Sequence, residues 1–168
     1  MINNQPVETV ETYKYLGTVI DNNLNGRKNA ERIYKKAIQR MYFVRKLKYL
    51  NVDTTIVSLF YRSIVESVVS FCIVCWFSGC TQVEKGKLNR IITSAKRLGC
   101  NTFTLEEIYN SAVTKSLVHI LRDSTHPLFN YFNLLPSGTR LMSIYCRTNR
   151  YKLSFVPSAI RSFNKSVL

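Results

Sequence analysis

Apolar residues recur at three- and four-residue steps through much of the chain, which is the period of one face of an α-helix. The longest such segment runs from about Gly26 to Leu50, and it predicts a helix with one apolar and one basic face. Its apolar face holds Ala30, Ile33, Tyr34, Ala37, Ile38, Met41 and Val44. Further helices are predicted over Thr54–Phe77, Gln82–Leu98 and Leu105–Arg122.

The predicted helix ends have typical capping residues. Asp53 is a good N-cap for the second helix, and Thr104-x-x-Glu107 has the spacing of a capping box. Gly99 lies just past the third helix, where glycine commonly ends a helix.

The two ends of the chain have different patterns. The N-terminal part predicts two short strands, Val7–Val10 and Tyr13–Ile20, with Gly17 as a bulge or a close backbone approach. In the C-terminal part, Met142–Cys146 is a possible strand and Ser158–Asn164 a short helix whose first turn suits Pro157. We therefore predict a mainly α fold: a short N-terminal β-hairpin, a bundle of about four helices, and an irregular tail. The expected divisions are residues 1–24, 25–125 and 126–168.

The charge of the chain points to an anionic partner. Its 24 Lys and Arg against 10 Asp and Glu give a net charge of +14. Such an excess repels itself unless something neutralises it, and nucleic acid is the leading candidate before a membrane surface. The first helix alone holds nine Lys or Arg and one acid, Glu31. Tyrosines lie among the basic residues, and that mixture suits phosphate contact with base stacking.

We select the candidate nucleic-acid-binding residues from the basic regions. On the first helix and the third they are Arg32, Lys35, Lys36, Arg40, Lys46, Lys87 and Arg90. In the tail, Arg147, Arg150 and Tyr151 could hold a single strand or could instead pair with the helices. A purely solvated basic face is the alternative for the whole set.

Membrane binding and secretion are not expected. Arg62 and Glu66 interrupt the apolar Thr54–Phe77 segment at a spacing that suits an i,i+4 pair, so a buried core helix is favoured over a transmembrane one. The apolar face of the first helix should pack on that helix, which leaves little for lipid. The odd number of cysteines, five, and the absence of a signal-peptide pattern predict an intracellular protein, nuclear or cytoplasmic.

No catalytic site, metal or cofactor is predicted. The three aspartates lie in three different segments, so they do not form the carboxylate pair of a two-metal polymerase. Cys72, Cys75 and Cys80 have zinc-like spacing, with His119 or His126 as a possible further ligand. Because the first two cysteines fall within an apolar helix, core packing is the favoured interpretation and metal the alternative.

Several motifs resemble the region after the catalytic palm in non-LTR (LINE-type) retrotransposon reverse transcriptases. The matching residues are Lys14-Tyr15-Leu16-Gly17, Leu47, Leu50, Phe60-Tyr61-Arg62-Ser63, Trp76, His126-Pro127-Leu128, Leu135-Pro136-Ser137-Gly138, Arg147-Thr148-Asn149-Arg150 and Ser154-Phe155-x-Pro157-x-Ala159-Ile160-Arg161. The resemblance implies a palm-edge hairpin, a helical thumb-like bundle and a basic tail. It also implies a non-catalytic fragment that grips template–primer phosphates and whose polymerase palm and fingers lie elsewhere.

A second resemblance concerns the helix pair Asn25–Ser67, which is similar to the N-terminal region of an AlkB-homologue tRNA-modifying protein. That resemblance implies an association with a 2-oxoglutarate dioxygenase and a methyltransferase. The chain lacks their signatures, because neither histidine begins a His-x-Asp/Glu motif and the six glycines are scattered. An inert product of a truncated mobile element is a third possibility.

Overall fold

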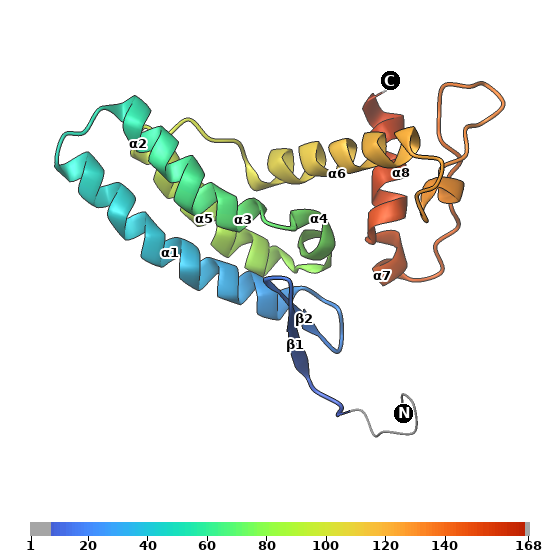
Figure 1. Cartoon of the computed structure of the whole chain (residues 1–168), viewed down its shortest axis with the longest axis horizontal. Helices are drawn as coiled ribbons and strands as arrows, with labels where there is room; N and C mark the ends of the chain where they lie inside the picture. The colour runs from blue at the N-terminus through green and yellow to red at the C-terminus, as the bar shows by residue number, and fades with distance from the viewer. Residues whose placement is uncertain (1–7, 167–168) are drawn as a thin grey trace.

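The computed structural model describes residues 8–166. It is mostly helical with a two-stranded hairpin before the helices, which confirms the predicted fold class (Figure 1). The hairpin, the long helix α1 (Arg27–Tyr49) and its neighbours occupy one part of the molecule. The last helices lie at the other end, beside α6 (Leu105–Arg122) (Figure 1).

The hairpin consists of β1 (Thr12–Tyr15) and β2 (Thr18–Asp21), paired antiparallel. Leu16 and Gly17 form its turn, with φ of 44° and 85°, and such doubly positive turns match the twist of hairpin strands. The prediction of one strand over Tyr13–Ile20 was therefore wrong, because Gly17 marks a turn and not a bulge. The predicted strand Val7–Val10 begins outside the described residues, and residues 8–10 are not in a strand.

Helix α1 carries the predicted apolar face. Ala30, Ile33, Ala37, Met41 and Val44 are buried in the main core, while Tyr34 is half-buried and Ile38 is exposed. This face packs against α5 and against the helices of the second apolar segment. The face that a lipid surface would need is thus covered by protein.

The second apolar segment is not one continuous helix, contrary to the prediction. It consists of α2 (Thr54–Tyr61), a π-helical turn η1 (Arg62–Glu66), α3 (Ser67–Ser70), α4 (Ile73–Trp76) and the 3₁₀ turn η2 (Phe77–Gly79). Asp53 caps α2 as predicted, accepting a hydrogen bond from the backbone N–H of Thr55 (2.8 Å). The helix breaks after α3 because Cys72 is left-handed, with φ of 48°.

The expected ion pair between Arg62 and Glu66 is also absent from the described residues. The Arg62 guanidinium donates to the carbonyl of Asn101 (3.3 Å), and Glu66 accepts from the hydroxyl of Thr102 (3.0 Å). Both residues belong to η1, where the wider π-helical turn changes the angular spacing of side chains four residues apart.

Helices α5 (Gln82–Arg97) and α6 complete the bundle with bounds close to those predicted. The capping box of Thr104 and Glu107 is confirmed, and Thr81 and Glu84 form another at the start of α5. Gly99 has φ of 87° just past α5, as expected of a C-terminal glycine.

The tail packs against α6 and forms a second hydrophobic cluster. Val113, Leu117 and Ile120 of α6 meet Phe132, Leu141, Ala159 and Ile160 there. The tail contains the 3₁₀ turn η3 (Phe129–Tyr131), α7 (Asn149–Lys152) and α8 (Phe155–Ser166), so its last helix is longer than predicted.

The possible strand Met142–Cys146 was a wrong prediction. Only a single bridge forms in this region of the described chain, between Leu134 and Leu141. The side-chain amide of Asn164 bonds both backbone groups of Leu141 (2.8 and 2.9 Å), and the Met142 N–H donates to the Asn133 carbonyl (2.7 Å). The start of the predicted strand is therefore bonded to α8 and to the preceding loop.

Among the described residues, one segment is long and apolar enough to cross a membrane, Thr54–Gly79, with mean hydropathy 1.6. Core helices of globular proteins pass the same test, so this is weak evidence for a span. Val57, Tyr61, Val65 and Val69 of this segment lie in the main core, and 28% of its most apolar window is buried.

Candidate nucleic-acid interface

Helices α1 and α5 lie side by side and run in the same direction. Near their first turns, Arg27 Nε lies 3.3 Å from Glu84 Oε1. Toward their last turns, an Arg45 Nη2 donates to Ser94 Oγ (3.4 Å). The outer sides of the two helices therefore form one continuous surface.

This surface is strongly cationic. We define the α1–α5 basic surface as a set of eight exposed Lys and Arg residues on the two helices. They are Lys28, Lys35, Lys36, Arg45, Lys46, Lys87, Arg90 and Arg97. Lys35 and Lys87 line a groove between the helices, together with Glu31 and Glu84. Lys28, Arg45 and Arg97 were not among the predicted site residues, although all three are exposed.

The acids of α1 and α5 do not neutralise these cations. The two helices hold one acid each, Glu31 and Glu84, and both lie within ion-pair distance of Arg27 (3.8 and 3.3 Å). Within residues 8–166, none of the other Lys or Arg residues has a carboxylate within 4.0 Å. The eight cations of the α1–α5 basic surface are therefore available to an external anion.

Glu84 is held in its charged form at the start of α5. Burial alone would raise its pKa, but hydrogen bonds from the hydroxyl and backbone N–H of Thr81, together with the charges of Arg27 and Lys87, leave the pKa lowered overall. The carboxylate therefore serves the capping box and Arg27, and it also acts on the charge of Lys87 without forming an ion pair with it.

Two predicted phosphate-binding residues have partners inside the protein. Arg32 donates from Nη2 to the carbonyl of Gly17 and to Asn29 Oδ1, which ties α1 to the hairpin. Arg40 donates from Nη1 to the carbonyl of Ile64 (2.6 Å) in η1. Both side chains are half-buried, so they brace the hairpin and the π-helical turn against α1.

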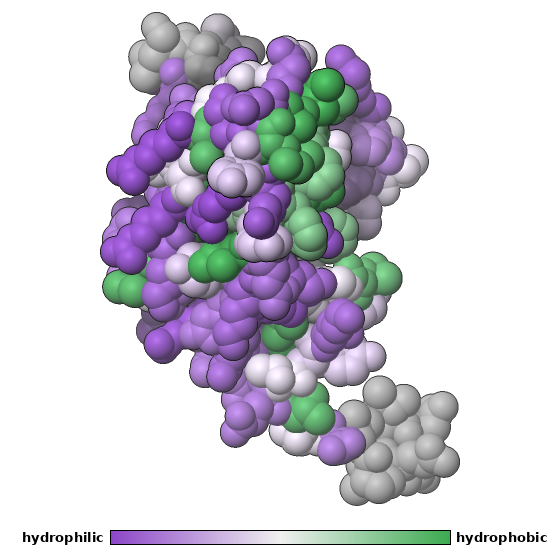
Figure 2. Space-filling view, turned by 90° about the vertical axis from the view of Figure 1, so that its left-hand side faces the viewer, coloured by the Kyte–Doolittle hydropathy of each residue, from purple (hydrophilic) through white to green (hydrophobic). Residues whose placement is uncertain are grey.

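Aromatic rings accompany the cations at the end of α1. Lys46 Nζ lies 5.7 Å from the ring centre of Tyr42 and 5.9 Å from that of Tyr49, both of which are exposed. Figure 2 views this end of the bundle, where hydrophilic side chains cover most of the face between separate hydrophobic patches. Exposed rings beside lysines can stack on bases while the lysines contact phosphates.

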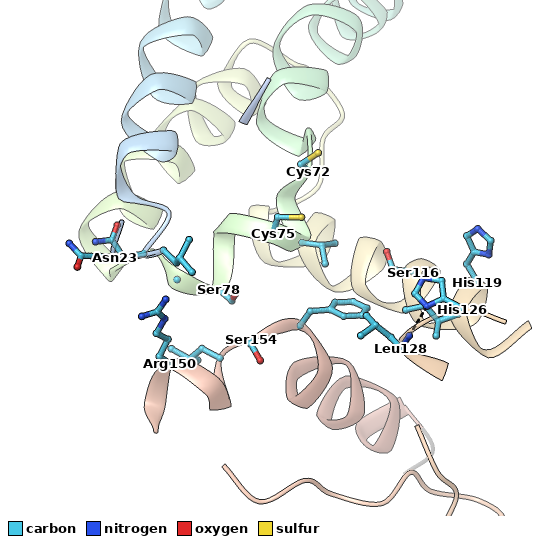
Figure 3. A pocket seen from close by; sticks show the side chains of 17 residues that line it. Asn23, Cys72, Cys75, Ser78, Ser116, His119, His126, Leu128, Arg150 and Ser154 are labelled. Atoms are coloured by element: carbon cyan, nitrogen blue, oxygen red, sulfur yellow. Dashed lines mark hydrogen bonds between the residues drawn. The ribbon is translucent and has the colours of Figure 1, made fainter. Parts of the chain in front are cut away.

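The predicted tail residues lie on a different part of the molecule. Arg147 precedes α7, and Arg150 and Tyr151 belong to it; all three side chains are exposed. Arg150 lines a cavity of about 890 Å³ and points toward the segment that carries Asn23, just before α1 (Figure 3). No described contact joins the three to the α1–α5 basic surface, so they form a separate cationic region.

The same cavity receives the zinc-like cysteines. Cys72 and Cys75 line it and are exposed, whereas Cys80 is buried, so the prediction that the first two pack in the core was wrong. The left-handed Cys72 ends the helix there and turns both thiols outward. Figure 3 shows the cysteines on one wall and His119 with His126 on another.

The described residues do not assemble a metal site. No group of three or more His, Cys, Asp or Glu side chains in residues 8–166 could hold a metal ion. His126 Nδ1 accepts a hydrogen bond from the Leu128 N–H (3.1 Å) and serves the local turn. The donor set of an iron dioxygenase, two histidines and a carboxylate, does not fit these residues, and no step through iron is assigned to them.

Comparison with known families gives one match. Residues 27–67 match the family described as "Alkylated DNA repair protein alkB homolog 8, N-terminal". The match covers α1, α2, η1 and the first residue of α3, less than half of the chain. Neither the curated proteins nor the solved structures give a match. The resemblance to the AlkB-homologue region is thus supported over this helix pair, and no comparison supports the reverse transcriptase resemblance.

Proposed function

We propose that the chain is a non-catalytic nucleic-acid-binding module that holds a duplex by its phosphates on the α1–α5 basic surface. One observation carries the proposal: the acids of α1 and α5 both lie within ion-pair distance of Arg27, while eight exposed cations of the same two helices have no carboxylate within 4.0 Å in residues 8–166. A cationic surface of this kind binds phosphates without reading sequence.

Within the predicted set, the contacts fall to five residues. Lys35, Lys36 and Lys46 on α1 and Lys87 and Arg90 on α5 are exposed and would meet phosphates. Arg32 and Arg40 act as positioning residues, because their guanidinium groups already bond backbone carbonyls. Arg147, Arg150 and Tyr151 would contact a single-stranded continuation of the same nucleic acid.

The salt dependence of binding tests the proposal. Neutralising about five phosphates releases about five counterions, so the logarithm of affinity should fall with the logarithm of salt at a slope of about −4.5 for a duplex. The measurement is a fluorescence anisotropy titration of a labelled 20-base-pair duplex (roughly two helical turns) at several chloride concentrations. A salt-insensitive affinity, or no binding at low salt, contradicts the proposal.

The larger setting of the module is a second proposal. The family match covers the helix pair that carries the α1 part of the basic surface, which favours a role beside an AlkB-homologue enzyme that acts on nucleic acid. The thumb of a LINE-type reverse transcriptase is the other setting, and it rests on the sequence motifs alone. In that setting residues 1–24, 25–125 and 126–168 would be palm edge, thumb and tail.

A competition assay separates the two settings. A module of a tRNA-modifying protein should prefer folded tRNA, whereas a polymerase thumb should prefer an RNA–DNA template–primer hybrid. The same protein should be assayed for bound iron and for 2-oxoglutarate turnover, and clear turnover would overturn the non-catalytic assignment.

All five cysteines are free thiols, which supports an intracellular setting.

A further inference from the structure

A second cationic site lies on the opposite flank of α5, away from the α1–α5 basic surface. It is a pocket of about 500 Å³ between η2, α5, α6 and the C-terminal helix α8. Lys85, Arg161 and Lys165 line it, and no carboxylate does among the described residues. Three cations from two distant parts of the chain thus meet in one concave site.

Hydroxyl groups accompany the three cations. Ser78, Ser158 and Ser162 line the pocket from η2 and α8. Tyr109 of α6 also lines it, and its hydroxyl is buried without a hydrogen-bond partner in the described structure. A buried hydroxyl normally has a partner, so an unpaired one beside three cations indicates a place for an acceptor-rich ligand.

Two of the three cations, Lys85 and Arg161, are held in position before any ligand binds. Lys85 Nζ lies 4.4 Å from the ring centre of Phe77, which forms one wall of the pocket. Arg161 donates from Nη2 to the Lys152 carbonyl (2.6 Å) and to Ser158 Oγ (3.0 Å). These bonds fix the guanidinium plane, and within residues 8–166 they leave Nε and Nη1 of Arg161 for a ligand.

We propose that this pocket binds a phosphate group. A phosphate has several acceptor oxygens and up to two negative charges, which matches three cations with the hydroxyl donors of Ser78, Tyr109 and Ser162 better than a single carboxylate would. The hydroxyl of Ser158 already donates to the Leu153 carbonyl (3.3 Å). The ligand is either inorganic phosphate or the terminal phosphate of a nucleic-acid strand. The site is independent of the duplex-binding function, since it uses the other side of α5.

Two lysines of α5 provide a matched test. Lys85 lines the phosphate pocket, whereas Lys87, two residues later, lines the groove shared with α1. Binding is measured by calorimetry with inorganic phosphate, and with otherwise identical oligonucleotides that carry a 5′-phosphate or a 5′-hydroxyl. Lys85→Met should weaken phosphate binding about tenfold, the effect of removing one charged hydrogen-bond partner. Lys87→Met should leave it unchanged but lower the salt slope of duplex binding by about one.

Tyr109→Phe supplies a second variant that should not unfold the protein. It removes a hydroxyl that has no partner, so thermal stability without phosphate should be retained or raised, while the stabilisation by added phosphate should shrink.

The binding results also identify the source of the phosphate. If the 5′-phosphate strand binds more tightly than the 5′-hydroxyl strand, and Lys85→Met loses this difference, the ligand is the end of a strand. Equal binding of both strands together with saturable inorganic phosphate identifies free phosphate. Absence of saturable binding by either ligand, or equal binding by wild type and Lys85→Met, overturns the proposal.

Discussion

Gly26 joins the start of α1 to the break in the apolar segment, and its replacement by alanine should strongly destabilise the protein. Its φ of 72° is left-handed, a conformation that costs an L-residue about 1–2 kcal/mol. A Cβ at this position would lie only 2.4 Å from the carbonyl oxygen of Trp76. Because that neighbour is the backbone of α4, α4 or α1 must shift, and forcing atoms into a packed site costs about 1–3 kcal/mol more.

The total loss expected for Gly26→Ala is about 2–5 kcal/mol, a large share of the roughly 5–15 kcal/mol that stabilises a typical protein. At about 2–4 °C per kcal/mol for a chain of this length, the melting temperature should fall by roughly 4–20 °C. Gly86→Ala is the matched control, since Gly86 lies within α5 and a Cβ there meets no atom within 4 Å. That variant should gain about 0.5–1 kcal/mol from helix propensity.

Urea denaturation followed by circular dichroism measures both variants under the same conditions. The predicted order of unfolding free energy is Gly86→Ala, then wild type, then Gly26→Ala. A Gly26→Ala protein within about 0.5 kcal/mol of wild type, the range of neutral surface changes, would refute the close backbone contact between residues 26 and 76. Equal losses in both variants would refute it as well.

Three further predictions follow from single contacts. Arg40→Met should lower the free energy of unfolding by about 1–3 kcal/mol in urea denaturation, because the Ile64 carbonyl loses its donor. Lys36→Met should change it by no more than about 0.5 kcal/mol. Equal effects of the two substitutions would refute the bracing role of Arg40. Burial raises the pKa of Cys80 to about 12, so its thiol should resist iodoacetamide at pH 8 in the native protein. The exposed Cys72 should be alkylated under the same conditions. Rapid alkylation of Cys80, detected by mass spectrometry, would contradict this prediction. In the unfolded chain the Cys80 thiol ionises near its ordinary pKa of 9, whereas in the folded protein it ionises only near 12. The free energy of unfolding should therefore fall as the pH rises from about 9 toward 12, by up to about 1.4 kcal/mol per pH unit. This fall should be smaller in Cys80→Ala, and equal pH profiles of the two proteins would contradict the raised pKa.

The helices with strong local signals were predictable from the sequence. Helix α6 begins at Leu105, immediately after Thr104, because the hydroxyl and Glu107 satisfy the first backbone N–H groups. The apolar face of α1 was predictable because its period of three and four residues reports burial directly. Both signals are local, and tertiary contacts did not override them.

The break at Cys72 was not predictable in the same way. The segment is apolar without a glycine or proline near the break, so no local residue indicates a left-handed turn. A hydrogen bond from Trp76 Nε1 to the Phe71 carbonyl (3.0 Å) spans the turn, and an apolar pattern does not indicate such a bond. The positions of the two thiols follow from this break, and so they were misjudged as well.

The candidate site was predicted in part for a related reason. Helical periodicity places Arg32 and Arg40 at the edge of the basic face, but it does not show that a long guanidinium group can bend inward to a backbone carbonyl. It also does not show that α5 runs parallel to α1. That packing places Lys87 in a groove shared with α1, while Lys85, two residues earlier, lines a different pocket.

The central claim is that duplex binding depends on the position of the cations on α1 and α5 and not on the net charge of the chain. Two variants of equal net charge test this claim. One replaces Lys35, Lys46, Lys87 and Arg90 of the α1–α5 basic surface by methionine or glutamine. The other does the same at four exposed cations elsewhere, Lys14, Lys115, Arg122 and Arg140. The duplex salt slope should fall by about 3.6 in the first variant, at about 0.9 per lost phosphate contact, and stay near the wild-type value in the second. Equal losses in both would show that binding follows net charge alone and would contradict the assigned interface.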